Sequence, residues 1–133
     1  MESIHSSSSA LSLLIVDDDI SAIETLRLMI PMKFPDVIIY VAGNGKMGVE
    51  LCKEHAPDIV VTDINMPEMD GIQMAEEIKS MKVDTKFIAI SGYSDKIHLD
   101  KFNDIGISDY MLKPIDLKKL FAAIGKCIDE INL

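Results

Sequence analysis

Five side chains that could do chemistry follow short apolar segments of this 133-residue chain. They are Asp17, Asp18, Asp63, Ser91 and Lys113. If the three carboxylates meet, they place about three negative charges in one small site, where one of them would tend to hold a proton. A hard dication removes this conflict, because Mg²⁺ favours oxygen ligands and is usually held by one or two carboxylates with waters and phosphate oxygens. The residue types therefore indicate phosphate chemistry at a magnesium site.

Asp63 is the candidate nucleophile of such a site. With a metal bound, its carboxylate could attack a phosphoryl donor and form an acyl phosphate. Mg²⁺ and Lys113 would neutralise the charge of the phosphoryl group, and Ser91 offers its hydroxyl to one phosphoryl oxygen. Asn65 could add its backbone carbonyl to the metal. Each residue alone could equally be a turn former or an ordinary surface residue, but their joint placement favours the functional interpretation.

The segments that would position these residues alternate between strands and helices. The expected strands cover 11–16, 37–41, 59–62, 87–90 and 109–112, and the expected helices cover 20–30, 46–55, 70–81, 95–103 and 117–131. Near-continuous apolar runs of this length are typical of strands buried in a parallel sheet. Strict alternation predicts an α/β fold with helices on both faces of the sheet. Because such sheets bind ligands outside the carboxyl ends of their strands, the candidate side chains are expected to meet at one rim.

Caps and breakers set the expected helix ends. Asp19 is the expected N-cap of the first helix, Pro31 is expected to close that helix, and Asp116 is the expected N-cap of the last helix. The core-facing side of the first helix would carry Ile20, Ile23, Leu26 and Ile30.

The composition excludes several classes of protein. A hydrophobic content of 48% with 26% charged residues is typical of a globular chain, and the length suits one domain. The net charge of −9 argues against direct nucleic-acid binding by this segment and against docking on anionic membrane. No apolar run approaches the ~20 residues needed to span a bilayer. Cys52 and Cys127 have no metal-ligand spacing and are expected to be small buried residues.

The first ten residues differ in composition from the rest of the chain. They include five serines, one His and one Glu, and they lack the basic start and apolar core of a signal peptide. Residues 1–10 are therefore expected to be a flexible serine-rich tail, and residues 11–133 a single domain of a cytoplasmic protein.

Four blocks of sequence carry a likeness to a known family. They are Leu14-Ile15-Val16-Asp17-Asp18-Asp19, Val61-Thr62-Asp63-Ile64-Asn65-Met66-Pro67 with Met69-Asp70-Gly71, Ile90-Ser91-Gly92, and Tyr110-Met111-Leu112-Lys113-Pro114. In order and spacing they resemble the receiver domain of bacterial two-component response regulators, over about residues 11–132. The resemblance implies a flavodoxin-like, doubly wound parallel sheet of five strands in the order 2-1-3-4-5, with five helices.

The resemblance also implies a metal centre. Asp63 would be the phosphoacceptor and, with Asp18, a direct metal ligand. Asn65 would bind the metal through its backbone carbonyl, and Asp17 through a water. The ion would be Mg²⁺, for which Mn²⁺ can substitute.

Further roles follow from the same likeness. Ser91 would be the switch hydroxyl, Tyr110 the switch aromatic, and Lys113 the partner of the phosphoryl group, with a cis peptide bond to Pro114. Asn65 and Tyr93 would tune dephosphorylation, and Tyr93 could shield the acyl phosphate from water.

The implied function is that of a signalling switch and not of an enzyme in the usual sense, since the chain would catalyse only its own phosphorylation and slow dephosphorylation. The donor would be a phosphohistidine of a histidine kinase or a histidine phosphotransfer domain. The face made by 95–103, 109–112 and 116–131 would respond and bind an output domain, a partner or a second copy. The apolar residues expected on this face are Ile97, Leu99, Phe102 and Ile115.

Two other functions compete with this interpretation. Asp17, Asp19 and Ser21 are spaced as in the haloacid-dehalogenase phosphatases, in which the first Asp is the nucleophile, although such enzymes normally have a longer chain with a cap. A flavodoxin-like electron carrier would need a hydroxyl- and glycine-rich phosphate loop after the first strand, where this chain has three aspartates that would repel phosphate.

Overall fold

The computed structural model describes residues 11–81, 83–92 and 96–133. Its strands are β1 (Ser12–Val16), β2 (Ile38–Ala42), β3 (Ile59–Asp63), β4 (Lys86–Ser91) and β5 (Asp109–Leu112). They form one parallel sheet in the order β2-β1-β3-β4-β5. The helices are α2 (Ile20–Lys33), α3 (Gly45–His55), α4 (Gly71–Ser80), α5 (Lys96–Ile105) and α6 (Leu117–Ile131). The predicted fold class and strand order are confirmed.

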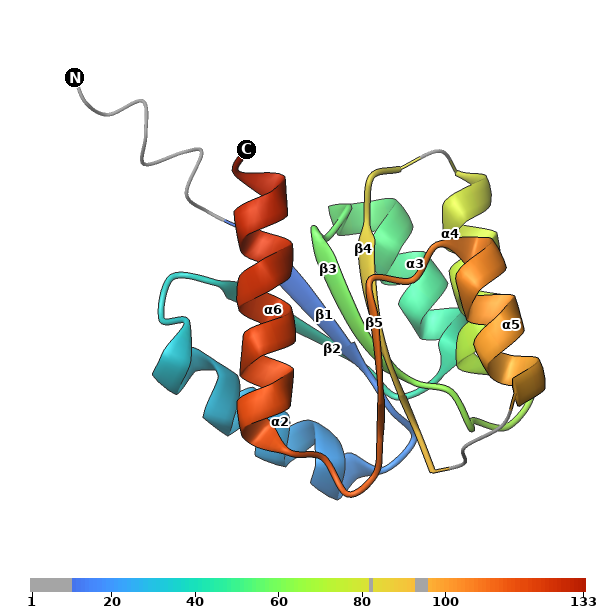
Figure 1. The fold of residues 1–133 in the computed structure, drawn as a ribbon, viewed down its shortest axis with the longest axis horizontal. Helices are drawn as coiled ribbons and strands as arrows, with labels where there is room; N and C mark the ends of the chain where they lie inside the picture. Colours follow the sequence, from blue (N-terminus) through green and yellow to red (C-terminus); the bar gives the residue numbers. More distant parts are fainter. Residues whose placement is uncertain (1–10, 82, 93–95) are drawn as a thin grey trace.

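Helices cover both faces of the sheet, α2 and α6 on one side and α3, α4 and α5 on the other (Figure 1). Alternate residues of the central strands serve the two layers. Leu13 and Ile15 of β1 pack in the core under α2 and α6, whereas Leu14 and Val16 pack in the core under α3 and α4. Because the central strands are buried on both faces, their sequences are nearly continuous runs of apolar residues.

Strand register places the chemistry-bearing strand ends beside one another. Val16 of β1 pairs with Thr62 of β3, so the residues that follow them, Asp17 and Asp63, are neighbours at the carboxyl rim. On the other side of β3, Asp63 pairs with Ile90 of β4, directly before Ser91. Three strands thus deliver polar residues to one short stretch of the rim.

Side-chain caps start the helices that follow these strand ends. Asp19 accepts a hydrogen bond from the backbone of Ser21, and Asp116 accepts one from Lys118, as the sequence predicts. Asp70 forms a capping box with Gln73, because each side chain accepts a hydrogen bond from the other residue's backbone N–H. These bonds fix where each helix begins relative to the rim.

Two expectations for the first helix are wrong. Pro31 lies inside α2, which continues for two more residues to Lys33. The fixed φ of proline, about −65°, is itself a helical value, so proline does not turn the chain out of the helix although it removes an N–H donor. Ile20 is 75% exposed and not part of the core. At 100° per residue, the buried Ile23, Leu26 and Ile30 centre about 90° around the helix from Ile20.

The expectation that Phe102 of α5 lies on an exposed apolar face is also wrong. It is only 3% exposed and packs in a small core with Ile64, Ile72 and Ala89, so it does not belong to an exposed apolar face. Ile115 is partly buried against the larger core. The Ile97 and Leu99 side chains lie outside the described part of the structure, as does the expected tail of residues 1–10.

The two cysteines and the lengths of the helices were also subjects of sequence-based expectations. Cys52 and Cys127 are both buried free thiols, as predicted. Within the described ranges, no helix has the length and apolar character that a membrane crossing requires.

Candidate phosphoryl-transfer site

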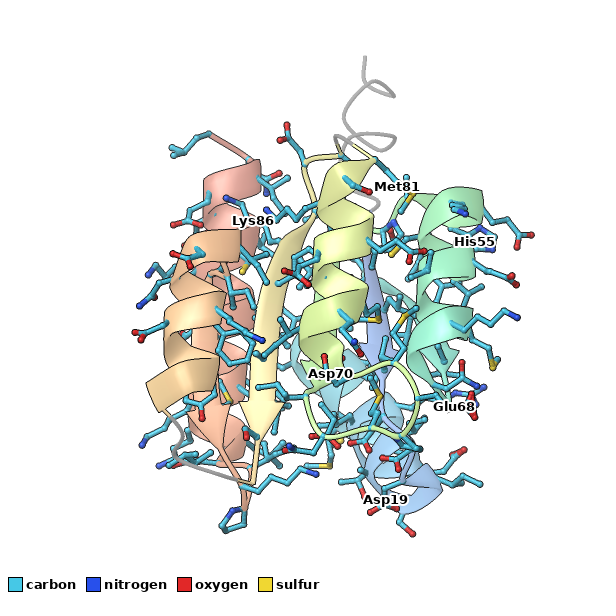
Figure 2. The ribbon with its side chains drawn as sticks, turned by 90° about the vertical axis from the view of Figure 1, so that its right-hand side faces the viewer. Asp19, His55, Glu68, Asp70, Met81 and Lys86 are labelled. Carbon is cyan, nitrogen blue, oxygen red and sulfur yellow. The ribbon has the colours of Figure 1, made fainter. Side chains whose placement is uncertain are left out.

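The polar strand ends and the loops that follow them gather at one end of the sheet. Figure 2 shows Asp19, Glu68 and Asp70 at this end, while His55, Met81 and Lys86 mark the opposite end. The site is therefore built from the β1–α2, β3–α4, β4–α5 and β5–α6 connections. These are the positions where an open α/β sheet holds its ligands.

Three carboxylates form the acidic part of the site. Asp17, Asp18 and Asp63 each offer an oxygen atom that lies within 4.8 Å of the other two. Asp17 and Asp63 are buried, at 4% and 3% exposure, while Asp18 is exposed. A set of oxygen ligands with one solvent-facing side suits a hard dication that keeps some of its waters. These residues fit Mg²⁺.

Asp17 has the most perturbed carboxyl group of the site. Burial raises the pKa of Asp17 from 3.8 to about 6. The Asp19 backbone N–H, 2.9 Å from Asp17 Oδ1, lowers that pKa, the Asp63 charge raises it, and the Lys113 charge lowers it. The structure thus concentrates negative charge where water is largely excluded, and a bound cation would relieve it.

Lys113 brings a positive charge to the same place from the end of β5. Its Nζ lies 3.3 Å from Asp63 Oδ2. Its backbone N–H donates to the Ser91 carbonyl at 2.8 Å, which ties the end of β5 to the end of β4. The Lys113–Pro114 peptide bond is cis, as expected. The lysine therefore approaches Asp63 on a tethered backbone.

Ser91 reaches the site through Asn65. The Ser91 side chain is fully buried at 0% exposure, and its hydroxyl donates to Asn65 Oδ1 at 3.3 Å. The Gly92 backbone N–H donates to the same oxygen at 3.4 Å. The Asn65 backbone N–H in turn donates to Asp63 Oδ1 at 3.4 Å. Asn65 thus connects the end of β4 to the Asp63 carboxylate.

Tyr110 lies beside this group on β5. It is half-buried, and its ring centroid lies 5.2 Å from that of Phe102 with an interplanar angle of 42°. The ring is thus packed against α5. Tyr93, expected to shield the site, lies outside the described residues.

Gly71 supports the site in a way that the sequence reading missed. A Cβ at this position would lie 2.5 Å from the Asp63 carbonyl oxygen and 3.0 Å from Ile64 Cα. The Gly71 backbone N–H donates to the Ile64 carbonyl at 2.9 Å. The first turn of α4 therefore rests directly on the backbone of Asp63. The signal was present in the sequence as Asp70-Gly71, but only as a helix start.

Comparison with known proteins agrees with this geometry. A sequence model described as the response regulator receiver domain matches residues 13–125. The chain belongs to the receiver domain family. Receiver domains are signalling domains that interact with histidine kinases, and they are not typical enzymes.

Individual relatives support the assignment of this receiver domain. The chemotaxis protein CheY of Bacillus subtilis is 34% identical over 120 residues, which cover 88% of this chain and 97% of CheY. The probable C4-dicarboxylate response regulator DctR of B. subtilis is 34% identical over 113 residues, which cover 85% of this chain and 50% of DctR. This chain thus spans about half the length of several curated relatives, including DctR and the transcriptional regulatory protein YdfI of B. subtilis.

Solved structures show the same fold. The N-terminal domain of an uncharacterised protein from Wolinella succinogenes is 34% identical, with a TM-score of 0.83 over 90% of this receiver domain and 95% of that chain. A CheY-like receiver domain protein from Methanospirillum hungatei has a TM-score of 0.83 at 22% identity, covering 91% of this chain and 95% of that one.

Proposed function

We propose that Asp63 of this receiver domain accepts a phosphoryl group from a phosphohistidine of a histidine kinase or a histidine phosphotransfer domain. The observation that carries the proposal is the environment of Asp63. This carboxylate is 3% exposed, lies beside two other carboxylates and has the Lys113 ammonium 3.3 Å away. An Asp63 oxygen forms the new P–O bond as the P–N bond to the imidazole breaks, and the electron pair of that bond leaves with the imidazole nitrogen.

The acidic residues divide the task of holding Mg²⁺. Asp18 and Asp63 would bind the ion directly, Asn65 would bind it through its backbone carbonyl, and Asp17 would bind it through a water. When bound, the ion would supply positive charge near the phosphoryl oxygens, and Mn²⁺ could substitute for it. Support for this assignment comes from the three carboxylate oxygens within 4.8 Å of one another and from the buried charge on Asp17.

The acyl phosphate then acts on the neighbouring residues. Phosphorylation replaces one negative charge by roughly two and adds three acceptor oxygens. Lys113 pairs with these oxygens and the Ser91 hydroxyl turns towards them, after which Tyr110 moves into the space that Ser91 leaves. The face formed by α5, β5 and α6 consequently changes and controls an output domain, a partner or a second copy. Asn65 and Tyr93 set how long the phosphoryl group persists.

The competing function is a small-molecule phosphatase that uses Asp17 as its nucleophile. The contacts favour Asp63, because the Lys113 ammonium that would neutralise a phosphoryl group is paired with Asp63. The Asp17 carboxylate instead accepts a hydrogen bond from the Asp19 backbone N–H.

Acetyl phosphate with Mg²⁺ tests the proposal. Intact-protein mass spectrometry is expected to show one added phosphoryl group on the wild type, and none on Asp63→Asn. Asp129→Asn, at an exposed position on α6, is the matched control and should be labelled like the wild type. Labelling that persists in Asp63→Asn, or phosphate-ester turnover that disappears only in Asp17→Asn, would contradict the proposal.

A further inference from the structure

The side chain of Asn65 makes contacts that a metal ligand acting through its backbone carbonyl does not need. Its Oδ1 atom accepts from the Ser91 hydroxyl at 3.3 Å and from the Gly92 backbone N–H at 3.4 Å. A backbone N–H can only donate, so the amide atom facing Gly92 is the oxygen. The Ser91 hydroxyl, which points at the same oxygen, is therefore the donor in its bond to Asn65.

The residues on either side of Asn65 fix its backbone, and this determines the position of its side-chain amide. Its neighbours Ile64 and Met66 are buried at 0% and 7% exposure, in two different parts of the core. The Ile64 backbone N–H donates to the Ile90 carbonyl at 2.9 Å, and that of Met66 donates to the Ile64 carbonyl at 3.1 Å. Asn65 itself is exposed, so its side chain lies over the end of β4 on a fixed support.

The contacts of Asn65 belong to a closed ring. Its backbone N–H reaches Asp63 Oδ1, its Oδ1 reaches Ser91, the Ser91 carbonyl accepts from the Lys113 backbone, and Lys113 Nζ returns to Asp63 Oδ2. A change at Asp63 can therefore reach Ser91 through Asn65 as well as through Lys113.

We infer that the Asn65 side chain is a positioning residue that holds the Ser91 hydroxyl and the Gly92 amide in the unphosphorylated arrangement. We call its two contacts, to Ser91 Oγ and Gly92 N, the Asn65 latch. The inference rests on the proposed function of Asp63. A serine hydroxyl carries one proton, so Ser91 cannot donate to Asn65 and to a phosphoryl oxygen with that proton at once. Phosphorylation therefore replaces the hydrogen bond from Ser91 to Asn65 by one from Ser91 to a phosphoryl oxygen. The Asn65 latch consequently stabilises the unphosphorylated arrangement against the phosphorylated one.

The lengths of the two contacts suit such an exchange. At 3.3 and 3.4 Å they are longer than the most favourable hydrogen bonds, so they are weak enough to be replaced. Their loss should favour the phosphorylated arrangement about threefold, since a net hydrogen bond of modest strength corresponds to a factor of that order.

Beryllofluoride binding with Mg²⁺, followed by ¹⁹F NMR, tests the latch. Asn65→Ala is expected to bind beryllofluoride about threefold more tightly than the wild type. Asn132→Ala, at an exposed position after the end of α6 and outside the responding face, is the matched control and should bind like the wild type. In a Ser91→Ala background the effect of Asn65→Ala should largely disappear, because its main partner is gone. In the ligand-free protein, the ¹H shift of the Gly92 amide should move upfield in Asn65→Ala.

The outcomes separate this inference from the proposed function. Equal or weaker beryllofluoride binding by Asn65→Ala, the same gain in the Ser91→Ala background, or an unmoved Gly92 amide would overturn the latch while leaving phosphorylation of Asp63 intact. Failure of the wild type to bind beryllofluoride would overturn the proposed function, and the switching role of the latch with it.

Discussion

Lys113 Nζ lies 3.3 Å from Asp63 Oδ2, so a partly exposed lysine and a carboxylate with 3% side-chain exposure form an ion pair at the rim of the sheet. The two residues are far apart in the sequence, on β3 and directly after β5. β4 lies between β3 and β5 in the sheet, so Lys113 must reach Asp63 across the end of β4. The hydrogen bond from the Lys113 backbone N–H to the Ser91 carbonyl holds the lysine close to that strand end. A phosphoryl group on Asp63 would thus form beside a positive charge already in place.

Removal of that charge should slow phosphorylation. Lys113→Met is expected to lower the rate of labelling by acetyl phosphate about 100-fold, the scale of losing one group that stabilises transition-state charge. The measurement is the initial rate of mass incorporation. Lys53→Met, at an exposed position on α3, should keep the wild-type rate. A rate within twofold of the wild type in Lys113→Met would contradict the role of this lysine.

The raised pKa of Asp17 predicts a pH-dependent stability. Because the pKa of Asp17 is about 6 in the folded protein, against an ordinary value of 3.8, the folded protein favours protonated Asp17. The resulting destabilisation is complete above pH 6 and absent below 3.8. Asp17→Asn should therefore increase the free energy of unfolding at pH 7 in EDTA, by up to about 3 kcal/mol.

Urea unfolding at several pH values checks this expectation. The gain from Asp17→Asn should shrink as the pH falls from about 6 towards 4. A variant that is less stable at pH 7, or a gain that does not vary with pH, would show that burial of this carboxylate has no such cost.

The same carboxylate should make metal binding pH-dependent. Mn²⁺, observed by the loss of its free EPR signal, should bind to the wild type with an affinity that falls below pH 6, by up to about tenfold per pH unit for one displaced proton. Asp17→Asn should bind Mn²⁺ more weakly at pH 7.5 but lose most of this dependence. A wild-type affinity that stays constant between pH 7.5 and 5 would count against a metal site at these aspartates.

Gly71 should be intolerant of a side chain. Gly71→Ala places a Cβ 2.5 Å from the Asp63 carbonyl oxygen, a backbone atom that cannot rotate away. We expect a loss of about 1–3 kcal/mol in unfolding free energy, as for overpacking elsewhere, together with slower labelling of Asp63. Gly125→Ala in α6 is the matched control, because nothing lies within 4 Å of its added Cβ. That variant should be more stable by about 0.5–1 kcal/mol. Equal stability of the two variants would contradict the close packing at Gly71.

The face of α5, β5 and α6 should change its association when Asp63 is modified. Light scattering is expected to show a higher mass for the beryllofluoride complex than for the free protein. Leu112→Glu, at a 45% exposed position on β5, should reduce this increase, while Leu28→Glu, at a 69% exposed position on α2, should not. An unchanged mass of the wild type with beryllofluoride would count against self-association through this face.

The sequence alone was sufficient for the order of the elements and for the residues at the strand ends. The alternation of apolar runs with helix-spaced segments predicts the parallel sheet, since strands buried on both faces have little freedom in composition. The sequence also predicts the helix caps Asp19 and Asp116, because a side-chain oxygen at that position satisfies backbone donors locally. Such local physical rules can be read from neighbouring residues.

Tertiary packing decided features that the local sequence does not predict. Phe102 entered the core beside Ile64 and Ile72, because the burial of a residue depends on the elements packed against it. The Asn65 side chain was also beyond sequence reasoning. Its partners, Ser91 and Gly92, come from another strand, and only the loop geometry decides that its oxygen faces them.

The sequence thus determines which residue types form the site, and the tertiary structure decides how they are arranged. Asp17, Asp63 and Lys113 become neighbours because the register of β1 with β3 and the insertion of β4 before β5 bring their strand ends together. That arrangement also raises the pKa of Asp17, because burial of a carboxylate is a property of the folded protein and not of its sequence neighbours.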